Sequence, residues 1–326
     1  MRRLKSDVLL LGDECDAVTV EAPPPDVPRV LAVLNDAYRA AAEGDFGRAI
    51  PHFCAARSEL VPYVNSQRLA AAVSSESRKL GDESRAFEAL AADRENLTGP
   101  RTVLLSDSLG LPRAGPGEAD CFEKTYAGLI LHARRGPVQP IFRRLGTTWD
   151  VVDGLVNRAS LAGADVMIHI GLNDCAVRMF KEKERIALTL VSEYLRERFL
   201  RFVKAYRSKI VLSDLDYTYT PLHVFRDRLS RSVQIARRSR ARSISIATIV
   251  QPPETFAVRT PRMAWNFNRY NSVVREVAEQ NGITLIDING LCHHHGKEKT
   301  LSADGMHLSA AGHTLMADAY LDSIEQ

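Results

Sequence analysis

A chain of 326 residues is long enough to bury a large hydrophobic core, and it can hold one large domain or two smaller ones. Its 43 Lys and Arg against 40 Asp and Glu leave a formal net charge of only +3, which gives no reason to expect nucleic acid as a partner. The five cysteines are odd in number, dispersed and without metal-ligand spacing, which fits a reducing compartment better than a disulfide scaffold, so a cytoplasmic location is expected. The apolar run near the N-terminus, Val8 to Leu11, is too short for a signal peptide or a transmembrane segment, and no other segment approaches a membrane span.

The first part of the chain predicts a short N-terminal segment followed by helices. Residues 1–28 end in the Pro-rich linker EAPPPDVP at 21–28, and residues 29–98 are Ala-rich with helical periodicity. Within them EGDFGRAI at 43–50 and LGDESRAF at 80–87 share the pattern Gly-Asp-x-x-Arg-Ala, which suits the turn between two antiparallel helices. The region therefore loosely resembles tetratricopeptide-like helical hairpins. Two uses stay open: the hairpins cap the next domain, or they form a groove for a protein partner.

Beyond this region the pattern changes, and we place the start of a second domain, residues 99–326, at the helix-breaking stretch NLTGP. Short apolar runs now alternate with helical stretches, which predicts an α/β fold with a parallel sheet and helices on both faces. A long helical stretch within residues 180–220 suits a lid, a dimer contact or a partner surface. The five runs expected to be strands are TVLLSD, PVQPIF, DVMIHIG, SISIATIV and GITLIDI.

Polar residues follow two of these expected strands. The first run continues into SDSLG, residues 106–110, and the third ends in GLND, residues 171–174. Because the carboxyl ends of parallel strands meet at one edge of a sheet, the hydroxyl of Ser108 and the amide of Asn173 are expected to point at the same place. Each residue alone is also explained by a helix cap or a turn.

Near the C-terminus the stretch LSADGMHLSAAGH places Asp304 three residues before His307. In one interpretation Asp304 is the N-cap of the last helix, since helical periodicity follows it. In the other, Asp304 accepts a hydrogen bond from the ring of His307, fixes its tautomer and leaves the other ring nitrogen free to act as a base. The second interpretation needs a nucleophile elsewhere in the chain.

Taken together, SDSL, GLND and DGMH resemble the blocks of the SGNH, or GDSL, hydrolase superfamily, in the right order across about residues 101–326. The glycine of the remaining block is assigned to Gly146, with Gly128 as the alternative. The resemblance implies a three-layer αβα sandwich in which Ser108 is the nucleophile, His307 the general base and Asp304 the residue that orients it. It also implies an oxyanion hole made by the Ser108 N–H, the Gly146 N–H and the Asn173 amide, and neither a metal nor an organic cofactor.

One residue departs from the family pattern, because Ser106 stands where the family has Gly before the Asp, and its side chain is expected to perturb the turn. The stretch GLNDCAVRMF is also similar to a subgroup associated with bacterial surface polysaccharides, in which a Cys and an Arg follow this block. By that similarity Arg178 binds an anionic or sugar substrate; the alternative is that Arg178 pairs with a nearby carboxylate.

The resemblance implies a serine esterase that cleaves a small-molecule or glycan ester, with an acylated carbohydrate as the expected substrate. An O-acyltransferase that passes the acyl group to a sugar hydroxyl uses the same residues and stays open. A third hypothesis is a partner-binding protein in which the helical region carries the function and the hydrolase domain is degenerate.

Overall fold

The structure of the protein is a computed structural model that describes residues 27–92, 99–134, 136–213, 218–257 and 260–325. Most of the predicted N-terminal segment and Pro-rich linker, and most of the predicted domain boundary at NLTGP, lie outside these residues. The described chain divides into two compact units. The helical unit contains residues 27–78 and 178–213, and the sheet unit contains residues 79–177 and 218–325, apart from the gaps above. Within the described ranges, every helix is either too short or too polar to cross a membrane.

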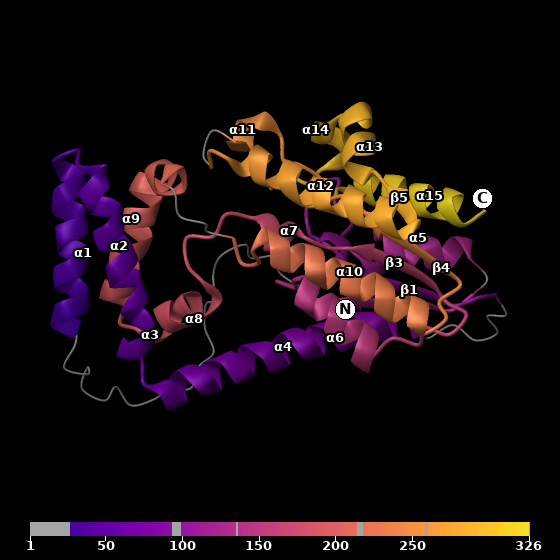
Figure 1. Cartoon of the computed structure of the whole chain (residues 1–326), viewed down its shortest axis with the longest axis horizontal. Helices are drawn as coiled ribbons and strands as arrows, with labels where there is room; N and C mark the ends of the chain where they lie inside the picture. Colours follow the sequence, from indigo (N-terminus) through magenta and orange to yellow (C-terminus); the bar gives the residue numbers. More distant parts are fainter. Residues whose placement is uncertain (1–26, 93–98, 135, 214–217, 258–259, 326) are drawn as a thin grey trace. The chain divides into compact units, whose positions relative to one another are not determined.

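The helical unit joins the N-terminal helices with the region around residues 180–213 (Figure 1). Aromatic side chains form much of its core: the ring of Phe53 stacks on Phe202 at 4.9 Å between centroids and meets the edge of Phe199 at 6.1 Å. A buried ion pair joins Arg57 to Glu184 at 3.0 Å. The helices of this unit are α1 (Val27–Ala42), α2 (Phe46–Ser58), α3 (Leu60–Tyr63), the first half of α4 (Ser66–Ala92), α8 (Glu182–Leu190) and α9 (Glu193–Leu212).

The two Gly-Asp sequences behave differently. The first is the turn between α1 and α2, where Gly44 has a φ of 78° and the Asp45 side chain caps α2 by accepting a hydrogen bond from Arg48 N at 3.1 Å. The second turn prediction is wrong, because Gly81 and Asp82 lie inside the uninterrupted helix α4. A glycine in a helix interior costs only about 1 kcal/mol relative to alanine, and good helix formers surround this one. Among the described residues the repeat therefore forms one hairpin and not two.

The sheet unit is built on five parallel strands in the order β2-β1-β3-β4-β5. All five apolar runs expected to be strands are strands, so the predicted α/β fold is confirmed. The strands are β1 (Thr102–Ser106), β2 (Val138–Phe142), β3 (Asp165–His169), β4 (Ser243–Ala247) and β5 (Thr284–Ile286).

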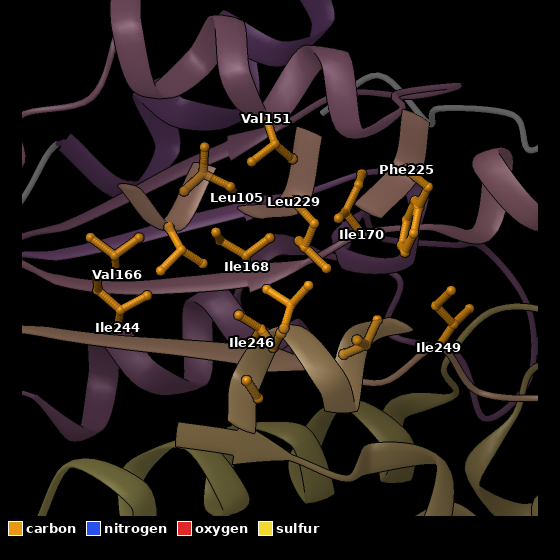
Figure 2. Close-up of a cluster of buried hydrophobic side chains, with 14 of the residues drawn as sticks. Leu105, Val151, Val166, Ile168, Ile170, Phe225, Leu229, Ile244, Ile246 and Ile249 are labelled. Atoms are coloured by element: carbon orange, nitrogen blue, oxygen red, sulfur yellow. The ribbon is translucent and has the colours of Figure 1, made fainter. Parts of the chain in front are cut away.

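Both faces of the sheet are covered, as expected of a parallel sheet whose strands are apolar throughout. Alternate residues of β1 separate the two cores: Val103 and Leu105 pack in one cluster, shown in Figure 2, and Leu104 packs in another. The first cluster includes α6 (Thr148–Asn157), α10 (Leu222–Arg238) and α12 (Met263–Asn281). The second includes α5 (Tyr126–Ala133) and α15 (Ala310–Glu325), which completes a three-layer αβα sandwich. The short elements are η1 (Ser108–Gly110), η2 (Phe122–Lys124), α7 (Leu172–Cys175), α11 (Glu254–Ala257), α13 (Ile288–His295) and α14 (Lys297–Thr300).

The second half of α4 belongs to the core of the sheet unit. The ring of Phe87 lies 5.2 Å from that of Phe142 and 5.3 Å from that of Phe122, and Glu88 accepts a hydrogen bond from Gln139 at 2.6 Å. The boundary between the compact units lies after Arg78 and not at residues 98/99, where the sequence pattern predicts it, and the helical unit also includes residues 178–213. That residues 29–98 fold as a separate domain stays a prediction.

We expect Phe87→Ala to lower the free energy of unfolding by about 3 to 5 kcal/mol, because it removes a buried aromatic ring from a packed core. Leu90→Ala is the matched control on the same helix, since Leu90 is 55% exposed and its loss should change stability by about 0.5 kcal/mol or less. Denaturant unfolding followed by circular dichroism measures both. Equal effects of the two substitutions would show that this part of α4 is not packed against the sheet.

Candidate active site

Ser108 lies where β1 ends and opens the short 3-10 helix η1. Asp107 caps this turn: its Oδ1 accepts a hydrogen bond from Leu109 N at 2.8 Å, and complete burial raises the pKa of Asp107 to about 7. The expected perturbation by Ser106 does not occur. Ser106 is still part of β1, and its hydroxyl donates to the backbone oxygen of His169 on the neighbouring β3 at 2.7 Å. The side chain is accommodated because it is satisfied within the sheet.

Asp304 and His307 lie in a tight loop that is closed at its base by an antiparallel bridge between Leu301 and Leu308. Gly305 makes this loop possible, because its φ of +66° lies in the left-handed region that favours glycine. Two backbone hydrogen bonds stabilise the loop: Ser302 N donates to His307 O and Gly305 N donates to Ser302 O, both at 2.8 Å. The loop therefore holds the carboxylate and the imidazole close together.

The last helix does not begin at Asp304. Helix α15 starts at Ala310, and the hydroxyl of Ser309 accepts a hydrogen bond from Gly312 N at 3.3 Å. The interpretation of Asp304 as the N-cap of this helix is therefore wrong, since another residue supplies the cap.

Ser108, His307 and Asp304 form a continuous chain of hydrogen bonds. The Ser108 Oγ lies 2.9 Å from His307 Nε2, and His307 Nδ1 lies 2.8 Å from Asp304 Oδ2. The other carboxylate oxygen of Asp304 accepts from the Ser302 hydroxyl at 2.7 Å and from the backbone N–H groups of Met306 and His307 at 2.9 and 3.1 Å. An acceptor at Nδ1 favours the tautomer with its hydrogen there, which directs the Nε2 lone pair at the serine.

The groups around Asp304 and His307 determine the protonation states of these two residues. Burial alone would raise the pKa of Asp304, but the hydrogen bond with His307, reinforced by the charges of His307 and Arg113 and by the Ser302 hydroxyl, holds this pKa well below its usual range. Burial is also the largest influence on His307 and lowers its pKa. The hydrogen bond with Asp304 opposes this effect, while the cations Arg113 and Arg144 add to it. Asp304 is thus ionised and His307 neutral near pH 7, as a base requires.

Hydrogen bonds join the loop that follows β2 to the loop that follows β3. Gly171, with a φ of +130°, lets the chain turn sharply from β3 into α7. The buried Asn173 on α7 donates from Nδ2 to the backbone oxygen of Gly146 at 3.0 Å. Asp174 accepts hydrogen bonds from the Thr148 N–H at 3.1 Å and from its hydroxyl at 2.9 Å. These bonds fix the position of the Asn173 amide.

The structure thus brings the predicted residues together in two groups. Ser108, Asp304 and His307 are hydrogen-bonded to one another, and Asn173 is bonded to Gly146. The N–H of Gly146 donates to Arg143 O at 3.0 Å, so an oxyanion would have to share this hydrogen. Arg178 belongs to the helical unit, and its role in substrate binding stays a prediction.

Sequence reasoning missed Arg113. Its Nη1 lies 2.9 Å from Asp304 Oδ2, and its Nη2 lies 2.7 Å from His307 Nε2. The one sequence feature that points to Arg113 is its position five residues after the candidate nucleophile, in SLGLPRAG. Arginine is common in surface loops, so this signal alone identifies no role.

A serine, a neutral imidazole and an orienting carboxylate at the carboxyl edge of a parallel sheet define a serine hydrolase. A sequence profile of the GDSL-like lipase/acylhydrolase family matches residues 130–315, more than half of the chain, and the chain belongs to this family. It is therefore a serine hydrolase that acts on ester bonds. The matched range contains Gly146, Asn173, Asp304 and His307 and starts after Ser108, whose assignment rests on its hydrogen bond to His307.

Solved structures resemble this chain at low sequence identity. The α/β hydrolase LAE5 from the metagenome of Lake Arreo is 18% identical, over 70% of this chain and 95% of that chain, with a TM-score of 0.48. A catalytic mutant of Axe2, an acetylxylan esterase from Geobacillus stearothermophilus, is 19% identical over 70% of this chain and 95% of its own, with a TM-score of 0.45. Phospholipase A1 from Streptomyces albidoflavus is 18% identical over 69% and 100%, with a TM-score of 0.47. A search of curated proteins finds no match.

Proposed function

We propose that the chain is a serine esterase that works through an acyl-serine intermediate on Ser108. The observation that carries this proposal is the hydrogen-bond chain from Ser108 Oγ through His307 to Asp304, with steps of 2.9 and 2.8 Å. Ser108 Oγ attacks the ester carbonyl carbon while its proton passes to His307 Nε2. The carbon–oxygen bond to the alcohol then breaks, and the departing alkoxide takes the proton from Nε2. Asp304 holds the imidazole in place and stabilises its charged form.

Water completes the cycle. His307, neutral again, removes a proton from water as the water oxygen attacks the acyl carbon, and the bond to Ser108 Oγ breaks with return of the proton to the serine. In both steps negative charge develops on the carbonyl oxygen. We assign its stabilisation to the Ser108 N–H and the Asn173 amide, with the Gly146 N–H as a third donor. Asn173 is suited to this role because its bond to Gly146 O and its burial hold the amide in one orientation.

The proposed substrate is an O-acylated carbohydrate. Its support is the similarity of GLNDCAVRMF to the polysaccharide-associated subgroup, which also carries the proposed role of Arg178 in substrate binding. We likewise keep two expectations from the sequence as proposals: a cytoplasmic location, from the cysteine pattern, and a protein partner for the N-terminal helices.

The function is tested by following the fate of an acetyl group. The enzyme is given a chromogenic acetyl ester together with candidate sugar acceptors at millimolar concentration, and acetate and O-acetylated sugar are both quantified. A hydrolase yields acetate equal to the released chromophore at every acceptor concentration, because water needs no binding site. If O-acetyl sugar replaces most of the acetate as the acceptor saturates, the enzyme is an acyltransferase, since only a bound acceptor gains the effective molarity of about 10⁵ M or more that outcompetes water. Absence of chromophore release would contradict both activities.

A further inference from the structure

Arg113 lies in the loop that follows η1, and this loop is fastened to the loop of Asp304 and His307. The backbone N–H of Ala310 donates to Gly117 O at 3.0 Å, and the carboxylate of Glu118 accepts from Ala303 N at 3.2 Å. The N–H of Arg113 itself donates to Ala119 O at 2.8 Å. The backbone of Arg113 is therefore held beside the dyad, and its side chain, 21% exposed, is partly open to solvent.

The guanidinium of Arg113 competes with Ser108 for the catalytic base. A neutral imidazole with its hydrogen on Nδ1 has one lone pair, on Nε2. Two donors lie within hydrogen-bond distance of His307 Nε2, Ser108 Oγ at 2.9 Å and Arg113 Nη2 at 2.7 Å. When the serine proton has moved to Nε2, an imidazolium N–H would face a guanidinium N–H, and both groups are positively charged. Arg113 must therefore leave Nε2 during turnover, although its Nη1 can stay on Asp304.

A displaced guanidinium needs an acceptor that is at least as good as the imidazole. Arg113 cannot lose its charge, and its planar pair of N–H groups matches a carboxylate. Burial is the largest cause of the lowered pKa of both Arg113 and His307, and the charge of a second cation, Arg144, adds to this lowering in both groups. An anion that approaches these arginines would partly neutralise them and would favour the imidazolium that forms as Ser108 attacks.

We propose that Arg113 determines specificity by moving from His307 Nε2 onto a carboxylate of the substrate, so that the enzyme prefers esters with a carboxylate near the bond to be cleaved. This inference rests on the proposed esterase function, because it assigns Arg113 a partner within the same site. The rival acceptor is Glu118, whose negative charge already acts on Arg113. If Glu118 receives the guanidinium, neutral and anionic esters benefit equally and Arg113 gives no preference.

The test compares pairs of esters that differ in one charge. On the acyl side the pair is mono-4-nitrophenyl succinate and 4-nitrophenyl butyrate; on the alcohol side it is the acetyl esters of 3-hydroxybenzoate and 3-hydroxybenzamide. We expect the wild-type enzyme to have a higher kcat/KM for the anionic member of at least one pair. Arg113→Gln should reduce this preference roughly ten- to hundredfold, the loss expected when a charge-assisted hydrogen bond is removed. Arg113→Lys, which keeps the charge without the planar pair of donors, should keep part of it.

The matched control is Arg134→Gln. Arg134 is also a partly buried arginine in an ion pair, at 2.8 Å from Asp165 Oδ2, but Asp165 is the first residue of β3 and so lies at the opposite edge of the sheet. The control should leave the preference unchanged. If the wild-type enzyme cleaves both members of each pair equally, or if Arg113→Gln retains the full preference, the inference is wrong. If Arg113→Gln does not fold, two other results test the inference. The wild-type enzyme must have a higher kcat/KM for the anionic ester, and Arg113→Lys must reduce this preference by at least about threefold.

A pH profile gives a second readout. With the neutral butyrate ester, kcat/KM should rise with pH as His307 loses its proton, because the base acts in its neutral form. Removing the positive charge in Arg113→Gln should move this rise to higher pH, while Asp304, Arg144, Glu118 and His313, the other titratable groups that act on this cluster, stay in place. An unmoved profile would contradict the contact with His307. No turnover of any ester would overturn the proposed function and this inference with it, whereas turnover without preference overturns the inference alone.

Discussion

Ser108→Ala is expected to lower kcat for ester cleavage by roughly 10⁴ to 10⁶, the range found when single members of a hydrolytic triad are removed. The variant keeps His307 and Asp304 but has no oxygen to form the acyl-enzyme. Its stability should change by about 0.5 kcal/mol or less, because the lost hydroxyl lies at a loop and packs little surface. Turnover of a chromogenic acetyl ester and the melting temperature measure the two effects separately.

Ser106→Ala is the matched control for this experiment. Ser106 lies two residues earlier, and its hydroxyl bonds to a backbone oxygen of β3 at 2.7 Å instead of to His307. We expect it to retain most of the activity and to lose about 1 kcal/mol of stability, the usual contribution of one buried hydrogen bond. If Ser108→Ala turned over ester at the wild-type rate, Ser108 would not be the nucleophile.

Asn173→Ala is expected to lower kcat by roughly 10² to 10³ with a much smaller effect on KM, because an oxyanion donor acts mainly in the transition state. The substitution also removes the hydrogen bond from Asn173 to Gly146 O, so part of any loss would come from a looser loop. Steady-state kinetics with a chromogenic ester measure the change.

Thr148→Val separates the two contributions. It removes the hydroxyl that bonds to Asp174 at 2.9 Å, and so loosens the same pair of loops, but it removes no candidate oxyanion donor. We expect less than about a tenfold loss of kcat, well below the effect of removing an oxyanion donor. A loss of less than threefold in Asn173→Ala, or equal losses in the two variants, would remove Asn173 from the oxyanion hole.

The features of this protein that depend on local patterns could be predicted from its sequence. Each of the five strands appears as a short apolar run, because a strand buried on both faces needs apolar side chains in succession. The spacing of Asp304 and His307 was equally readable, since a three-residue separation with Gly305 between them suits a tight loop. Even so, only the start of α15 at Ala310 decided between a helix cap and a dyad.

Tertiary structure alone decided the features that depend on distant partners. The same Gly-Asp pair is a turn at Gly44 and helix interior at Gly81, and a local preference of about 1 kcal/mol does not decide between the two. Phe87 looks like any apolar residue of a surface helix until the aromatic rings of the sheet unit surround it. Arg113 gains its role from an imidazole 194 positions away, and no local pattern records such a contact. Residues far apart in the chain meet only because β1 and the C-terminal loop end at the same edge of the sheet, a consequence of the parallel strand order.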